Sequence, residues 1–182
     1  MRSRFMPAAL VIMALLIDTS VVPFVLANPY IVSLTLVTVI ELSIYLGRMH
    51  GMLYGTLGGL LLDILVGHPL GFNTFRFIIL GFLSGTVAYE PVEERTRKAA
   101  SKLYFRRALT LFCAVLASEI AVYAYQYFET ALLSGAYFLN IGIRTAISTA
   151  LGMLLGPVDA RIILGKPKKY QLTSAKREVK SF

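Results

Sequence analysis

The stretch GMLYGTLGGLLLDILVGHPLGFNTFRFIILGFLSG, residues 51–85, consists of two apolar blocks separated by the sequence His68-Pro69-Leu70-Gly71. A helix that crosses about 30 Å of membrane hydrocarbon needs roughly 20 mainly apolar residues, with a range of about 17–25. Pro and Gly in the intervening segment favour a tight turn. The stretch therefore predicts a hairpin of two membrane-spanning helices, the first at about 51–67 and the second at about 72–89.

Small residues mark one face of the first predicted helix. Gly51, Gly55, Gly59 and Gly67 recur at intervals of four or eight, and Asp63 takes the intervening position. Residues four apart share a helix face, and small residues let helices approach closely in a membrane. The spacing predicts that Asp63 lies on a packed face and not against lipid. Similar spacings occur later in the chain, at Gly81 and Gly85 and at Arg144, Ser148, Gly152 and Gly156.

The rest of the chain has the same apolar character. Of its 182 residues, 57% are hydrophobic and 15% are charged, and the mean hydropathy is +0.69. Soluble domains have roughly 45–50% apolar and about 25% charged residues. Further apolar blocks cover about 5–27, 30–46, 108–128 and 137–160. The sequence predicts an all-α, polytopic membrane bundle of about six helices at 1–160, with a cytoplasmic helical hairpin at 90–107 and a basic tail at 161–182.

The basic residues predict how the chain is oriented. Of the 18 Lys and Arg residues, only Arg76 and Arg144 fall inside the predicted spans. The others fall on one side if both ends of the chain are cytoplasmic, and an excess of Lys and Arg marks cytoplasmic segments. The net charge of +8 is then explained by topology and by contact with anionic lipid, and not by nucleic acid. We expect a multi-pass protein of the bacterial cytoplasmic membrane.

Each predicted span carries at least one charged side chain. Those within the apolar part of each span are Asp18, Glu41, Asp63, Arg76, Glu119 and Arg144. A charge at a helix centre costs roughly 2.5–3.5 kcal/mol on insertion scales. Two interpretations stay open: the six charges form buried pairs that fix helix packing, or they take a direct part in binding a ligand or partner.

Depth along the helices suggests how these charges pair. Asp63 and Arg76 lie at similar depths on neighbouring spans, which predicts a contact between them, with Asn73 at the same level. Arg144 can share Asp63, or reach Asp18 or Glu119. Glu119 has no stripe of small residues beside it, so it either turns inward or meets a helix of another protein.

The sequence lacks several common catalytic and cofactor-binding motifs. It contains no phosphate-binding glycine loop, no HExxH and no GxSxG. The single cysteine, Cys113, can form no disulfide framework or Cys/His metal cluster. The sequence therefore predicts no cofactor, no metal and no catalytic residue.

The stretch 51–85 resembles the rod shape-determining protein MreD family. The resemblance rests on Gly59-Leu60-Leu61-Leu62-Asp63, followed by Pro69-Leu70-Gly71 and a helix with small residues. It implies that Asp63, Pro69, Gly71, Asn73 and Arg76 form the core of the family motif. It also implies a non-enzymatic scaffold in the cell-elongation (rod) complex, which binds MreC beside MreB, RodA and a class B penicillin-binding protein during lateral peptidoglycan synthesis.

Two other functions are considered. The MreD family is similar in fold to the substrate-binding subunits of energy-coupling-factor vitamin importers. Against that function, Ala8 and Ala14 do not have the Ala-x-x-x-Ala spacing expected for docking a coupling subunit. A lipid-handling enzyme is the third option, because embedded carboxylates can act as acids or bases when they are desolvated. The sequence offers no nucleophile or metal constellation to support it.

Overall fold

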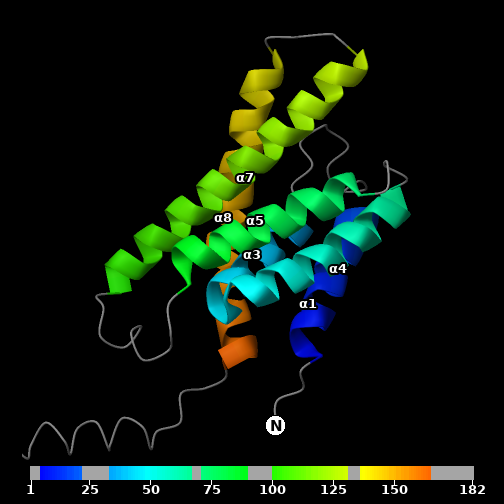
Figure 1. Ribbon diagram of the computed structural model, residues 1–182. Helices are drawn as coiled ribbons and strands as arrows, with labels where there is room; N and C mark the ends of the chain where they lie inside the picture. The colour runs from blue at the N-terminus through cyan, green and yellow to red at the C-terminus, as the bar shows by residue number, and fades with distance from the viewer. Residues whose placement is uncertain (1–4, 22–32, 67–70, 90–99, 131–135, 165–182) are drawn as a thin grey trace, which may run out of the picture.

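The computed structural model describes residues 5–21, 33–66, 71–89, 100–130 and 136–164, and these are almost entirely helical. The predicted all-α fold is confirmed. In chain order the elements are α1 (Met6–Leu16) continued by the π-helical turns of η1 (Ile17–Val21), α3 (Leu34–Leu46), α4 (Arg48–Val66), α5 (Phe72–Ala88), α7 (Ala100–Thr130) and α8 (Ala136–Leu164). They form one bundle (Figure 1).

Two helices are long and apolar enough to cross a membrane. These segments are Leu103–Tyr125 of α7 and Phe138–Pro157 of α8, whereas α1, α3 and α5 are apolar but shorter. Two boundaries differ from the sequence prediction. Residues 100–107, assigned above to the cytoplasmic hairpin, are the first turns of α7, and α8 continues four residues past 160 to Leu164. The remainder of that hairpin, 90–99, and the tail from 165 lie outside the described residues.

Helix α3 forms the centre of the bundle. Its residues from Thr35 to Ile44 are all buried, including Leu36, Val39 and Ile40. It contacts α1, α4, α5, α7 and α8. A helix that is apolar on all sides is stable only where other helices surround it, which accounts for this central position.

Helices α4 and α5 pack backbone against backbone. A Cβ atom added to Gly55 would come within 2.5 Å of the Phe77 carbonyl oxygen, and one added to Gly59 within 2.5 Å of Thr74 Cα. A Cβ on Gly81 would come equally close to the carbonyl oxygen of Gly51. The two helices run side by side along their length (Figure 1). Only glycine permits this approach, and the close packing positions the start of α5 beside the end of α4.

Helices α7 and α8 form a second, longer hairpin. They have 31 and 29 residues, so each is roughly 45 Å long at about 1.5 Å per residue. Where the chain passes from α7 to α8, both helices extend beyond the others (top of Figure 1). The hairpin packs on the rest of the bundle through α7 against α5 and α8 against α3.

Candidate functional site

The Asp63 carboxylate caps the N-terminus of α5. Its Oδ2 accepts hydrogen bonds from the backbone N–H of Gly71 at 3.0 Å and of Thr74 at 3.1 Å, and from Thr74 Oγ1 at 2.7 Å. Its Oδ1 accepts a hydrogen bond from the Asn73 N–H at 3.1 Å. The first N–H groups of a helix have no partner within it, and the positive end of the helix dipole favours a negative charge. The buried carboxylate is therefore stabilised by the backbone N–H groups and the hydroxyl at the start of α5.

Gly71 provides the backbone geometry that this cap requires. Its φ is 109°, in the left-handed region that favours glycine, and it lies immediately before Phe72, the first residue of α5. This conformation lets the chain turn from the end of α4 into α5 while the Gly71 N–H points at Asp63. Pro69, the other turn residue of the predicted motif, lies outside the described residues.

Asp18 makes the same arrangement at the start of α3. Its two oxygens accept hydrogen bonds from the backbone N–H groups of Leu34 at 2.9 Å and Thr35 at 2.7 Å, and from Thr35 Oγ1 at 2.6 Å. In both cases an Asp near the end of one helix binds the first turn of the next helix and a Thr hydroxyl within it. Two of the six predicted embedded charges are thus helix caps.

Arg76 does not pair directly with Asp63, which differs from the sequence prediction. Among the residues that the structure describes, Asp63 is hydrogen-bonded to the start of α5, and Arg76 Nη2 donates to Asn73 Oδ1 at 2.7 Å. The guanidinium also lies 5.6 Å and 5.2 Å from the ring centroids of Phe72 and Phe77, within cation–π range. Asn73 links the two charges, because its backbone N–H binds Asp63 and its side chain accepts from Arg76.

Glu119 of α7 pairs with Arg144 of α8. Their charged atoms are 3.5 Å apart, and their side chains are 13% and 20% exposed. Glu119 therefore turns inward, and of the three acids considered for Arg144 the structure brings Glu119 to it. Arg76 interacts electrostatically with both Asp63 and Glu119. We call Asp63, Asn73, Thr74, Arg76, Glu119 and Arg144 the outer network. Acids and bases alternate in it, with one charge from each of α4, α5, α7 and α8.

A second network surrounds Glu41, which is completely buried in α3. Its Oε1 accepts hydrogen bonds from Arg107 Nε at 2.9 Å and Nη2 at 2.6 Å. Arg107 Nη2 also donates to the Gly152 carbonyl oxygen at 3.0 Å, so one side chain of α7 binds α3 and α8 together. Asp159, also buried, interacts electrostatically with Arg107.

Gly156 and Tyr45 complete the surroundings of Arg107. A Cβ atom on Gly156 would collide with the Arg107 guanidinium, so the glycine provides the space that this side chain occupies. The Tyr45 ring lies 5.6 Å from the guanidinium, and its hydroxyl donates to the Gly156 carbonyl oxygen at 3.2 Å. Glu41, Tyr45, Arg107, Gly152, Gly156 and Asp159 form what we call the inner network.

Comparison with protein-family models matches residues 2–158 to the rod shape-determining protein MreD. The chain belongs to the MreD family. No curated protein and no solved structure matches it. The matched range includes all of the outer network and most of the inner one. Membership of the MreD family associates the chain with rod shape determination and with a membrane, in agreement with the two helices that are long enough to span one.

Three members of the inner network of this MreD-family chain are not predicted from the sequence. Arg107 is counted there among the cytoplasmic bases, and Tyr45 and Asp159 are not predicted to take part. The available signal for Arg107 is its position directly before an apolar block, together with the need of the embedded Glu41 for a base. The four-residue spacing of Gly152 and Gly156 is visible in the sequence, but it does not reveal that Arg107 fills the space at Gly156 and donates to the carbonyl oxygen of Gly152.

The arrangement in this MreD-family chain connects helices. Each of the four acids Asp18, Glu41, Asp63 and Glu119 is hydrogen-bonded to a different element from its own. Within the described residues there is no group of three or more His, Cys, Asp or Glu that could hold a metal ion. Removing one partner of a buried ion pair typically costs about 3–5 kcal/mol. These contacts therefore favour the observed arrangement of the helices over any that would leave a buried charge unpaired.

Proposed function

We propose that the chain is a non-enzymatic scaffold subunit of the bacterial cell-elongation complex, which binds MreC and supports lateral peptidoglycan synthesis. Family membership supports the cellular role. The observation that carries the scaffold role is the outer network, because it takes one charged side chain from each of four helices and uses them to bind one another. Side chains engaged in this way resist rearrangement, which suits a subunit that positions others.

The proposed location is the cytoplasmic membrane, with six crossings and both ends inside. The distribution of basic residues supports this orientation, because Arg76 and Arg144 are the only bases inside the predicted spans. Asp18 and Asp63 then lie toward the outer surface, and Glu41 and Arg107 toward the cytoplasm. The outer network is thereby on the side where wall synthesis takes place.

We place the contact with MreC on the outer end of the α7–α8 hairpin. At roughly 45 Å these helices exceed the ~30 Å hydrocarbon thickness of a bilayer, so their ends project from it. This end carries exposed apolar side chains, among them Phe128, Phe138 and Leu139. Phe128 lies beyond Leu103–Tyr125, the part of α7 that is long and apolar enough to span the membrane, whereas Phe138 and Leu139 begin the corresponding part of α8. A cluster of exposed apolar groups at this boundary is typical of a surface that another protein covers.

Affinity purification from a rod-shaped bacterium tests the proposal. We expect MreC to co-purify with the tagged full chain, and to be lost when Phe128 and Leu139 are both changed to alanine. Leu154→Ala is the matched control, because Leu154 is equally exposed but lies on the membrane-facing part of α8. Purification without any wall-synthesis protein would contradict the proposal. A small molecule retained tightly in place of MreC would favour the importer.

A further inference from the structure

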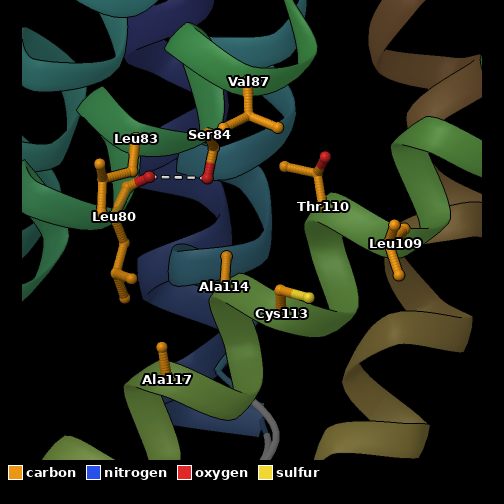
Figure 2. A pocket seen from close by; sticks show the side chains of 9 residues that line it. All are labelled: Leu80, Leu83, Ser84, Val87, Leu109, Thr110, Cys113, Ala114 and Ala117. Atoms are coloured by element: carbon orange, nitrogen blue, oxygen red, sulfur yellow. Dashed lines mark hydrogen bonds between the residues drawn. The ribbon is translucent and has the colours of Figure 1, made fainter.

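An apolar groove runs along the membrane-facing side of the bundle between α5 and α7 (Figure 2). Its volume is about 230 Å³. Buried Ser84 and Ala114 form its floor, and the half-exposed Leu83, Val87 and Leu109 stand at its edges. None of the residues that line it carries a charge.

The two hydroxyl groups in the groove are already hydrogen-bonded. Ser84 Oγ donates to the Leu80 carbonyl oxygen at 2.6 Å, the contact drawn in Figure 2, and Thr110 Oγ1 donates to the Arg106 carbonyl oxygen at 2.9 Å. Both bonds stay within the helix that carries the hydroxyl. The groove therefore offers its occupant little more than apolar surface, which suits a hydrocarbon and not a polar ligand.

The groove is shorter than the hydrocarbon thickness of one membrane leaflet. Its α5 side runs from Leu80 to Val87, which is roughly 10 Å at about 1.5 Å per residue. One leaflet contributes about 15 Å, half of the ~30 Å hydrocarbon thickness. Since α5 ends at Ala88, Val87 lies at the cytoplasmic end in the proposed orientation, and Leu80 lies near the middle of the membrane.

A cation lies at the cytoplasmic end of the groove. The Arg106 guanidinium donates to the carbonyl oxygen of Val87, so it reaches from α7 across to α5 at that end. Arg106 is one turn before Thr110, and its side chain is half-buried. An apolar channel that ends at a guanidinium matches a molecule with a hydrocarbon chain and an anionic head.

We propose that the α5–α7 groove binds an inner-leaflet anionic phospholipid, with one acyl chain between the helices and the phosphate at Arg106. The inference rests on the membrane orientation given under the proposed function. An acyl chain is favoured over a partner helix because the apolar length of the groove ends at the Arg106 guanidinium, which an anionic headgroup complements.

Photocrosslinking of the full chain in nanodiscs tests this inference. The probe is phosphatidylglycerol with a diazirine on one acyl chain, in a background of phosphatidylcholine, and the crosslinked residues are mapped by mass spectrometry. We expect crosslinks to concentrate within 80–87 and 109–117. Ala117→Phe fills the groove and should abolish them, whereas Ile120→Phe, at a lipid-exposed position of the same helix, should leave them intact.

The headgroup contact is tested by comparing two arginines. Arg106→Gln should lower groove crosslinking by phosphatidylglycerol about fivefold, which corresponds to ~1 kcal/mol per basic residue near an anionic membrane. Arg48→Gln, at the cytoplasmic end of α4 but away from the groove, should not. A phosphatidylcholine probe, in which the choline offsets the phosphate charge, should show a smaller difference between these variants.

Two results would overturn the inference. One is crosslinks spread evenly over all lipid-facing residues. The other is a groove crosslinked to a partner's helix in the complex purified from cells. Capture of MreC is measured on the same preparations. If MreC is captured but the groove is not crosslinked by lipid, only this inference fails; if the reverse holds, only the proposed partner fails.

Discussion

The carboxylate of Asp63 accepts a 2.7 Å hydrogen bond from the hydroxyl of Thr74, in the first turn of the following helix. Asp18 makes the equivalent contact with Thr35 at 2.6 Å. The two pairs occupy equivalent places, each where one helix ends and the next begins. An acidic side chain whose burial in a membrane costs free energy thus stabilises the N-terminus of the next helix.

The Asp63 cap predicts a difference between two threonines. Thr74→Val removes a hydrogen bond to a carboxylate and should lower the free energy of unfolding by about 1 kcal/mol. This is less than the roughly 1.5–3 kcal/mol of bonds to charged groups, because bonds between membrane helices are weak. Thr56→Val should change it by less than about 0.5 kcal/mol, since the Thr56 hydroxyl is exposed and donates to its own helix at Met52. Reversible unfolding in detergent measures both. Equal losses would contradict the assigned role of Thr74.

Adjacent arginines at the start of α7 should behave differently. Arg107→Gln leaves Glu41 buried without its base and should cost about 3–5 kcal/mol. Arg106→Gln changes a partly exposed side chain and should cost less than about 1 kcal/mol. Thermal unfolding in the same detergent compares the two variants. If Arg106→Gln were the more harmful substitution, the inner network as described would be incorrect.

The Glu119–Arg144 pair should be exchangeable. Glu119→Arg alone places two bases together between α7 and α8, and should reduce both thermal stability and the capture of MreC. The double variant Glu119→Arg with Arg144→Glu restores opposite charges and should recover part of each. The single loss is expected to be about 1–2 kcal/mol, because the pair is partly exposed and therefore screened. No recovery in the double variant would count against a pairing role.

Two glycines give a test of the α4–α5 contact. Gly55→Ala places a Cβ atom within 2.5 Å of the Phe77 carbonyl oxygen, so the helices must separate, at a cost of about 1–3 kcal/mol. Gly142→Ala meets no atom within 4 Å and should raise stability by about 0.5–1 kcal/mol, because alanine favours a helix. Melting temperatures report both changes. A harmless Gly55→Ala would show that the two backbones are not in contact.

Much of this fold follows from patterns visible in the sequence. Long apolar blocks predict the helices, and glycines spaced by four predict the face on which α4 meets α5. Spacing along a helix also gives depth, which places Asp63 and Arg76 at similar levels. The depth of a charged residue along its helix does not identify the group that it binds. Asp63 is satisfied by backbone N–H groups of α5, a type of partner that a search for opposite charges overlooks.

Arg107 illustrates a second limit on what the sequence predicts about the site. Counting the bases outside the spans gives a prediction of topology, but it treats every base near a boundary as solvated. The helix that carries Arg107 begins at Ala100, which brings Arg107 into the bundle, and the space for its guanidinium comes from Gly156 on a helix far along the chain. This match between a large side chain and a distant glycine is visible only once the helices are placed together.

A double-mutant cycle on Glu41 and Arg107 tests most directly whether the embedded charges hold the helices together. The free energies of unfolding of Glu41→Gln, Arg107→Gln and the double variant are measured in one detergent. If the two side chains stabilise the bundle by binding each other, the double variant should be no less stable than Arg107→Gln alone, because the second change removes a charge already left unpaired. Losses that simply add would show that the two residues act independently, and the scaffold described here would be contradicted.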